Sequence, residues 1–434
     1  MVIREKNRRK LQTLLCCLFI GALCLCTGCG KEDGATKATE KVKATESVTP
    51  EETEETEETE DSAQGSIVTD SEEIDAMAAA VVKNMTLEEK VGQMFIVNLE
   101  QLDDSNGDCF EFRKFTDDMK ESMDAYKIGG VILFARNIES VDQTKKLISD
   151  LQENAQIPLF VSVDEEGGDV ARVGNNSNMR TTTFPPMEEV GKMDDEKYAY
   201  NMGTTIANDI KDLGFNLDFA PVADVKTNEY NTEIGNRAFG SDADLVSRMV
   251  KQVVNGIQSQ GISATLKHFP GHGSVSGDTH DTAVNADTDL ITLRSTEFKP
   301  FEAGIQAGAD FVMVSHISIS KVTEDTVPAC MSKLVIQTML REELDFDGVV
   351  VTDALDMGAI TEGYEPEDAA INCVKAGVDV LLMSTDLNAS YEAVLEAVKE
   401  GTIEESQIDD SVRRIMTVKI KRGIVRSNTE LLDR

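Results

Sequence analysis

Three of the four histidines in this 434-residue chain lie within thirteen residues, in a segment rich in glycine. His268 directly follows Lys267, and the segment ends in Asp278-Thr279-His280. In an extended stretch, residues two apart project to the same side, so the Asp278 carboxylate can orient the His280 imidazole and support its charged form. Such a pair transfers protons at neutral pH, because the ordinary pKa of histidine is about 6.5. The spacing therefore predicts a general acid/base dyad.

A zinc site is one alternative for this histidine cluster. Two histidines four apart on a helix share a face and bind zinc together, as in H-E-x-x-H. Here Pro270, Gly271 and Gly273 interrupt any helix between His268 and His272. A glycine-rich surface loop with incidental histidines is the other alternative, and it leaves the Lys-His pair unexplained. We therefore expect a catalytic loop with no metal and no cofactor.

Short apolar runs recur along the chain and are expected to form the strands that carry these groups. Each run is continuous rather than alternating, as in strands that are covered on both faces. Helix-period segments separate the runs, and a capping-box sequence begins at Thr86. The strand candidates are 94–97, 130–134, 159–163, 215–220, 262–266, 311–314, 349–351 and 378–383, and the helix candidates include 141–155, 245–260, 332–344, 389–399 and 408–422.

Eight strands that alternate with helices predict one α/β domain, a single (β/α)8 TIM-type barrel. A doubly wound open sheet is the alternative, but no G-x-G-x-x-G follows the first strand, which weakens a dinucleotide-binding version. Barrel enzymes place their chemistry at the C-terminal ends of the strands. Polar side chains follow all eight runs at that end: Asn98, Arg136, Asp164, Asp224, Lys267 with His268, Ser315 with His316, Asp353, and Ser384 with Asp386.

Residues 1–29 are expected to be a bacterial lipoprotein signal peptide. A basic stretch at residues 4–10 precedes an apolar run at 11–25, which is too short to span a bilayer comfortably. Leu25-Cys26-Thr27-Gly28-Cys29 then resembles a lipobox, with Cys26 where such boxes usually carry Leu. A plain secretory signal is the alternative. We expect an extracytoplasmic protein at the cell surface, attached to the membrane only through a lipid on Cys29.

Residues 30–75 are expected to be a disordered acidic tether, and residues 76–434 the catalytic barrel. The tether segment holds sixteen acids and four lysines, a net charge of −12, with almost nothing apolar to bury. Residues 76–434 still carry −29 once this tether and a leader of +4 are taken from the total of −37. This acidity argues against binding nucleic acid or an anionic membrane surface. Cys109, Cys330 and Cys373 are expected to be buried free thiols.

The histidine segment carries a family resemblance. Lys267-His268-Phe269-Pro270-Gly271-His272-Gly273, followed by Asp278-Thr279-His280, resembles the signature of β-N-acetylglucosaminidases (β-N-acetylhexosaminidases) of glycoside hydrolase family 3. Further motifs match in the same order over most of the barrel: 128–137, 164–168 with Arg172, 216–222, 235–239 and 346–353.

The resemblance implies a retaining exo-glycosidase that hydrolyses terminal non-reducing β-linked GlcNAc, with peptidoglycan fragments as the expected source. Asp353 matches the nucleophile, His280 the general acid/base and Asp278 its partner. Asp356 is a rival nucleophile, but it falls past the strand end. The residues that match groups holding the sugar are Asp164, Arg172, Arg237, Lys267 and His268.

Two departures from the family pattern and two other functions stay open. Glu165 replaces the usual Gln, and Asp169 replaces an Arg and adds negative charge near the mouth. A phosphorylase on the same site is one alternative, because a histidine acid/base repels phosphate less than a carboxylate does. A non-catalytic sugar-binding lipoprotein is the other. The chain has no Trp, which favours a small pocket for one terminal sugar, and we expect a monomer acting on a small carbohydrate.

Overall fold

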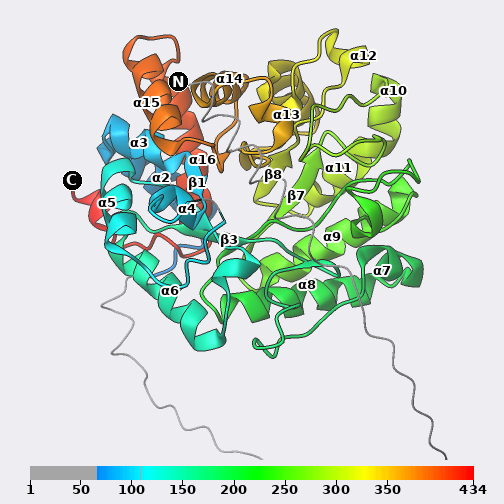
Figure 1. Ribbon diagram of the computed structural model, residues 1–434, viewed down its shortest axis with the longest axis horizontal. Helices are drawn as coiled ribbons and strands as arrows, with labels where there is room; N and C mark the ends of the chain where they lie inside the picture. The colour runs from blue at the N-terminus through cyan, green and yellow to red at the C-terminus, as the bar shows by residue number, and fades with distance from the viewer. Residues whose placement is uncertain (1–65, 108) are drawn as a thin grey trace, which may run out of the picture. The chain divides into compact units, whose positions relative to one another are not determined.

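The computed structural model describes residues 66–107 and 109–434, which form a closed parallel barrel (Figure 1). The hydrogen-bonded order is β10-β1-β2-β3-β6-β7-β8-β9, and every neighbouring pair is parallel. A bridge between Val351 and Val380 joins the two ends. The predicted (β/α)8 barrel is confirmed. Its strands are β1 (Phe95–Val97), β2 (Gly130–Ile132), β3 (Phe160–Val163), β6 (Leu217–Asp218), β7 (Ser263–Phe269), β8 (Phe311–Val314), β9 (Val349–Thr352) and β10 (Leu381–Leu382).

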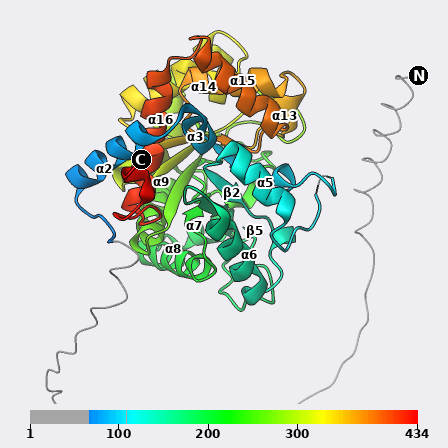
Figure 2. The same cartoon turned by 90° about the vertical axis from the view of Figure 1, so that its left-hand side faces the viewer.

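Helices surround the strands, as the two views show (Figures 1 and 2). The expected helix at 332–344 is wound as a π-helix, η6 (Leu334–Glu343), and a shorter π-helical turn, η4 (Leu293–Glu297), precedes α11. The α-helices are α2 (Ser71–Asn84), α3 (Leu87–Gln93), α4 (Leu99–Leu102), α5 (Asp117–Tyr126), α6 (Val141–Asn154), α7 (Met187–Met193), α8 (Glu196–Lys211), α9 (Ala243–Ser259), α10 (Leu290–Thr292), α11 (Phe298–Gln306), α12 (Ser320–Thr323), α13 (Gly358–Thr361), α14 (Pro366–Ala376), α15 (Leu387–Lys399) and α16 (Glu405–Lys421).

Two local sequence features explain how helix α3 begins and how α8 and α9 pack. The predicted capping box is present: the Thr86 hydroxyl accepts from the Glu89 amide at 3.2 Å, and the Glu89 carboxylate accepts from the Thr86 amide at 2.9 Å. Helices α8 and α9 pack closely because glycine faces backbone at their contact. A Cβ on Gly256 would lie 2.3 Å from the carbonyl oxygen of Tyr200. Any larger residue would push the two helices apart.

A lysine from α16 holds the base of the barrel together. The Lys419 ammonium group is fully buried and donates to Gln93 Oε1 at 2.6 Å, to the Gly129 carbonyl at 2.9 Å and to the Pro158 carbonyl at 2.6 Å. These acceptors lie just before β1, β2 and β3. One side chain therefore satisfies polar groups at the starts of three neighbouring strands, which would otherwise be costly to bury.

Two sequence expectations are wrong in detail. Helix α2 begins at Ser71, so the last five residues assigned to the tether belong to the fold, and Ile74 is buried. The acids that made this stretch resemble a tether lie in the first helical turn, where the helix dipole favours negative charge. Cys109 is exposed, whereas Cys330 and Cys373 are buried free thiols.

The expected signal peptide, with Cys29, lies outside the described residues, as does most of the expected tether. Within the described ranges, the structure has no helix that is both long enough and apolar enough to cross a membrane.

Candidate active site

A cavity of about 300 Å³ opens where the barrel strands end. That volume is at the small end for ligand pockets and suits a single sugar ring. Seven of the eight residues predicted for the site line this cavity. They are Asp164, Arg172, Arg237, Lys267, His268, His280 and Asp353. The eighth, Asp278, contacts His280 from the same loop.

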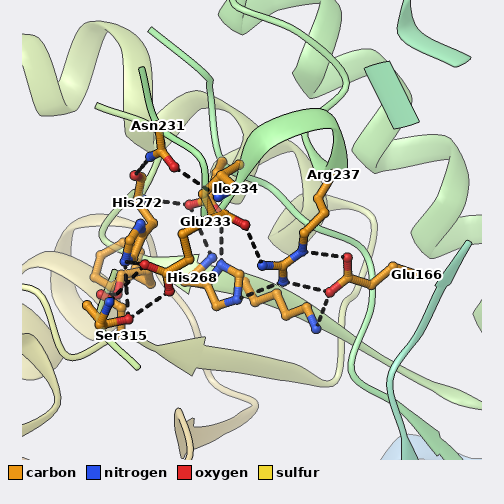
Figure 3. Close-up of polar contacts among 12 residues, drawn as sticks. Glu166, Asn231, Glu233, Ile234, Arg237, His268, His272 and Ser315 are labelled. Atoms are coloured by element: carbon orange, nitrogen blue, oxygen red, sulfur yellow. Dashed lines mark hydrogen bonds and ion pairs between the residues drawn. The ribbon is translucent and has the colours of Figure 1, made fainter. Parts of the chain in front are cut away.

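Buried opposite charges fix one wall of the cavity (Figure 3). Lys267 Nζ, on β7, lies 2.9 Å from Asp164 Oδ1 and 2.7 Å from Glu166 Oε1. Arg237 binds Glu166 with two parallel hydrogen bonds, Nε to Oε2 at 2.9 Å and Nη2 to Oε1 at 2.7 Å. Burial raises the pKa of Glu166, but Arg237 and Lys267 outweigh it and hold the pKa below its usual range. The site therefore presents charged donors in a fixed geometry, which suits sugar hydroxyls and amides.

A buried carboxylate orients the histidine that follows Lys267. The Asp224 side chain is fully buried, and its Oδ2 lies 2.7 Å from His268 Nδ1. Its Oδ1 accepts from the His272 backbone amide at 2.6 Å. Burial raises the pKa of Asp224, and the charge of His268 and its hydrogen bond more than offset this, so the pKa lies below its ordinary value. The ring of His268 is thereby fixed with Nε2 near Arg237, at 3.4 Å from Nη2.

Asp278 and His280, which the sequence predicts to be an acid/base dyad, lie in contact on the loop between β7 and α10, residues 270–289, here called the acid/base loop. His280 Nδ1 lies 2.8 Å from Asp278 Oδ1, which also accepts from the His280 backbone amide at 2.9 Å. Burial raises the pKa of Asp278, but these hydrogen bonds outweigh it and lower the pKa. The network assigns the Nδ1 proton to the bond with Asp278, which leaves Nε2 to exchange a proton with substrate.

The described residues bring one further carboxylate to this dyad. Ligand atoms of Glu233, Asp278 and His280 lie within 4.8 Å of one another. Within this group Asp278 and His280 are hydrogen-bonded to each other at 2.8 Å, an arrangement that allows proton transfer at His280 Nε2.

Asp353 directly follows β9, lines the cavity and is partly buried. Burial raises its pKa, but the imidazoles of His268 and His316 outweigh this and hold the pKa of Asp353 below its ordinary value. Asp356 also lines the cavity, and burial followed by the charge of Asp353 raises its pKa to about 6. Neighbouring acids with separated pKa values take different roles. Of the two, Asp353 has the lowered pKa and Asp356 the raised one.

The turn after β9, which begins at Asp353, also binds the acid/base loop. The Gly358 amide donates to the His280 carbonyl at 2.9 Å, and the Ala359 amide donates to the Thr279 carbonyl at 3.1 Å. A Cβ on Gly358 would lie 2.3 Å from the Asp281 carbonyl oxygen. Only glycine allows this approach, so one turn positions both Asp353 and the loop that carries His280.

Two polar residues noted in the sequence, His316 and Glu165, contact the backbone around the site. His316 does not line the cavity: it is buried, with Nε2 2.8 Å from the Ala354 carbonyl oxygen and Nδ1 3.3 Å from Cys330 Sγ. Glu165 is buried and accepts from the backbone amides of Val173 and Gly174, at 2.7 Å each. Both therefore support the backbone around the site.

The second departure, Asp169, is exposed, lies outside the cavity lining and accepts from Asn236 Nδ2 at 2.7 Å. Its charge stays at the surface beside the loop that holds Arg237.

Sequence reasoning gave Glu166 and Asp224 no role and missed Glu233. Glu166 stands in the hairpin of β4 (Glu165–Gly167) and β5 (Val170–Ala171), where its spacing of two from Asp164 was a usable signal. Glu233 stands in an irregular loop, where no periodicity points to a partner.

Comparisons with known proteins identify the family of the chain. Residues 86–418 match the glycosyl hydrolase family 3 N-terminal domain. Beta-hexosaminidase A of Pseudoalteromonas piscicida is 30% identical over 379 residues, which cover 80% of this chain and 63% of that protein, so the chain spans less than two thirds of that relative. The beta-hexosaminidase of Idiomarina loihiensis is 33% identical over 297 residues, covering 68% of this chain and 87% of that protein.

A solved structure extends the comparison to the fold. The glycoside hydrolase family 3 β-N-acetylglucosaminidase from Paenibacillus sp. str. FPU-7 superposes with a TM-score of 0.73 at 34% identity, over 81% of this chain and 68% of that one. With the family match covering most of the barrel, the chain belongs to glycosyl hydrolase family 3 and is a glycosidase.

Proposed function

We propose that this protein is a retaining exo-β-N-acetylglucosaminidase that removes terminal non-reducing β-GlcNAc. One observation carries the proposal: Asp353, with its lowered pKa, and His280, paired with Asp278, line the same cavity of about 300 Å³. A nucleophile and an acid/base facing one sugar-sized space are what retention requires. The relatives named beta-hexosaminidase support GlcNAc as the sugar.

The proposed reaction has two steps. Asp353 attacks the anomeric carbon while His280 Nε2 gives its proton to the glycosidic oxygen, which leaves as an alcohol. His280 then takes a proton from water, and the resulting hydroxide attacks the anomeric carbon and releases Asp353. Asp164 accepts hydrogen bonds from sugar hydroxyls, while Lys267 donates them. A histidine in the acid/base role departs from the usual scheme of two carboxylates.

The charges around His280 favour water over phosphate as the second nucleophile. Asp278 Oδ1 and Glu233 Oε1 lie 2.8 and 3.7 Å from His280 Nδ1. A phosphate dianion that approached His280 would therefore come close to two carboxylates, which would repel it. We therefore propose hydrolysis rather than phosphorolysis. Added phosphate should yield no sugar-1-phosphate, and its appearance would support the phosphorylase alternative.

The nucleophile variant tests the proposal. Wild-type protein should release nitrophenol from 4-nitrophenyl β-GlcNAc with retained anomeric configuration, read by NMR. Asp353→Asn should lower kcat on the order of a thousandfold or more, because it removes the covalent step. Asp356→Asn is the matched control and should keep most of the activity. Full activity in Asp353→Asn, or GlcNAc binding without turnover in the wild type, would overturn the assignment.

We further propose that the enzyme acts as a monomer at the bacterial cell surface on peptidoglycan fragments, held by a lipid on Cys29. The basic, apolar and lipobox-like leader supports the anchor. Metabolic labelling with an alkynyl fatty acid should mark the wild type and not Cys29→Ala. Purified muropeptides should lose GlcNAc by mass spectrometry.

A further inference from the structure

Glu233 is a cavity residue that the family motifs leave without a role. It lies on the loop from β6 to α9, residues 219–242, and faces the acid/base loop. Its side chain is 7% exposed. Glu233 Oε2 accepts from the Thr279 backbone amide at 2.9 Å, and Oε1 accepts from the Thr279 hydroxyl at 2.8 Å. Since Thr279 separates Asp278 from His280, this carboxylate holds the central residue of the dyad twice.

The same carboxylate lies beside two imidazoles. Glu233 Oε1 is 3.7 Å from His280 Nδ1, and Oε2 is 3.4 Å from His272 Nε2. Burial lowers the pKa of His272, so that ring is neutral at pH 7 and does not cancel the negative charge. The other ionisable groups facing His280 are Asp278 on its own loop and Asp356 on the turn after β9. His280 therefore stands among carboxylates, and Glu233 and Asp356 come from two other loops.

The backbone that carries Glu233 is held firmly (Figure 3). Arg237 Nη1 donates to the Glu233 carbonyl at 3.2 Å. Asn231 Oδ1 accepts from the Ile234 amide at 2.9 Å, and its Nδ2 donates to the His272 carbonyl at 2.7 Å. The loop is thus braced internally by Arg237, which lines the cavity, and is bound to the start of the acid/base loop.

We propose that Glu233 is a positioning residue for proton transfer, which fixes Thr279 and thereby holds the His280 imidazole, in its protonated form, at the cavity. This inference rests on the proposed glycosidase function. It implies that Glu233 matters most when the leaving group needs a proton. An aglycone that leaves readily as an anion should depend on it little.

Three variants separate the contacts of Glu233 from its charge. Glu233→Gln keeps both contacts, because the amide oxygen accepts from the Thr279 amide and the amide nitrogen donates to the hydroxyl. Glu233→Ala removes both the contacts and the charge. Glu229→Gln removes the same charge from an exposed position four residues away on the same loop, and is the matched control.

The readouts are kcat/KM across pH for 4-nitrophenyl β-GlcNAc and for an alkyl β-GlcNAc, together with an NMR titration of the His280 ring. Glu233→Gln removes a carboxylate 3.7 Å from the imidazole of His280, whose side chain is 63% exposed. The alkaline limb of kcat/KM for the alkyl substrate should therefore move to lower pH, with a loss of up to about tenfold above it.

Glu233→Ala should lose about a hundredfold on the alkyl substrate and much less on the nitrophenyl substrate. Glu229→Gln should match the wild type throughout. An unchanged NMR midpoint and pH profile in Glu233→Gln would overturn the proposal. Equal losses of kcat/KM on both substrates with a lowered Tm would also overturn it, because they would indicate a purely structural role. If Glu233→Ala fails to fold, Glu233→Gln decides. Absence of turnover in the wild type would refute the glycosidase function, whereas the NMR titration still tests the Glu233–His280 contact.

Discussion

A buried acid beneath the acid/base loop should make the stability of this enzyme depend on pH. Glu297 ends η4 and is 1% exposed. It lies against Gly271, where a Cβ would come within 2.6 Å of Glu297 Oε2. Burial first, and then the charge of Asp224, raise the pKa of Glu297 to about 8. Glu297 is therefore a neutral acid in the folded protein at pH 7.

The sign and size of the effect follow from linkage. The folded pKa of Glu297, about 8, exceeds its ordinary value of 4.5 by about 3.5 units. At about 1.36 kcal/mol per unit, the full contribution is at most about 5 kcal/mol. Because the unfolded chain loses this proton first, the contribution is complete below pH 4.5 and disappears as the pH rises through 8. Glu297→Gln cannot ionise, so it should remove this pH dependence.

Urea denaturation at pH 5, 6, 7, 8 and 9 measures the effect. Between pH 5 and pH 9, the free energy of unfolding of the wild type should fall by about 3–5 kcal/mol more than that of Glu297→Gln. Glu302→Gln, which removes an exposed acid from α11, should follow the wild type. A constant difference between wild type and Glu297→Gln at every pH would show that Glu297 does not change its ionisation on folding, and would refute the reasoning.

Two further substitutions test how the site is held. Glu166→Gln should lower the free energy of unfolding by about 3–5 kcal/mol in urea denaturation, because it leaves Lys267 and Arg237 buried with less opposing charge. It should also raise KM. An unchanged KM would show that these cations do not hold substrate. Gly358→Ala should lower kcat at least about tenfold with a smaller change in Tm. The added Cβ would displace the Asp281 carbonyl from the turn below His280. A kcat equal to that of the wild type would show that the turn does not position the loop.

The barrel and the dyad were accessible to sequence reasoning because their signals are local. The apolar run 311–314 coincides with β8, and the spacing of Asp278 and His280 gave their contact. The run 378–383 contains a strand of only two residues, β10, because pairing with β1 and β9 determines which part joins the ladder.

Contacts between different loops could not be predicted from the sequence. Arg237 and Glu166 are 71 residues apart, and Glu233 and Thr279 are 46 apart. Each pair joins two different strand–helix loops, whose lengths and conformations carry no period that would align them. Sequence reasoning therefore found which residues belong at the mouth and missed which of them hold one another.

The position of Lys419 near the end of the chain also affects when the barrel can finish folding during synthesis. The acceptors of Lys419 precede it by 326, 290 and 261 residues. During synthesis, β1 to β3 therefore leave the ribosome long before the group that satisfies their buried ends. A nascent chain that is interrupted before α16 would lack Lys419, so these buried acceptors would have no donor from that helix. Catalytic competence thus arrives late in translation, and prematurely terminated products are expected to be inactive and readily cleared by proteases.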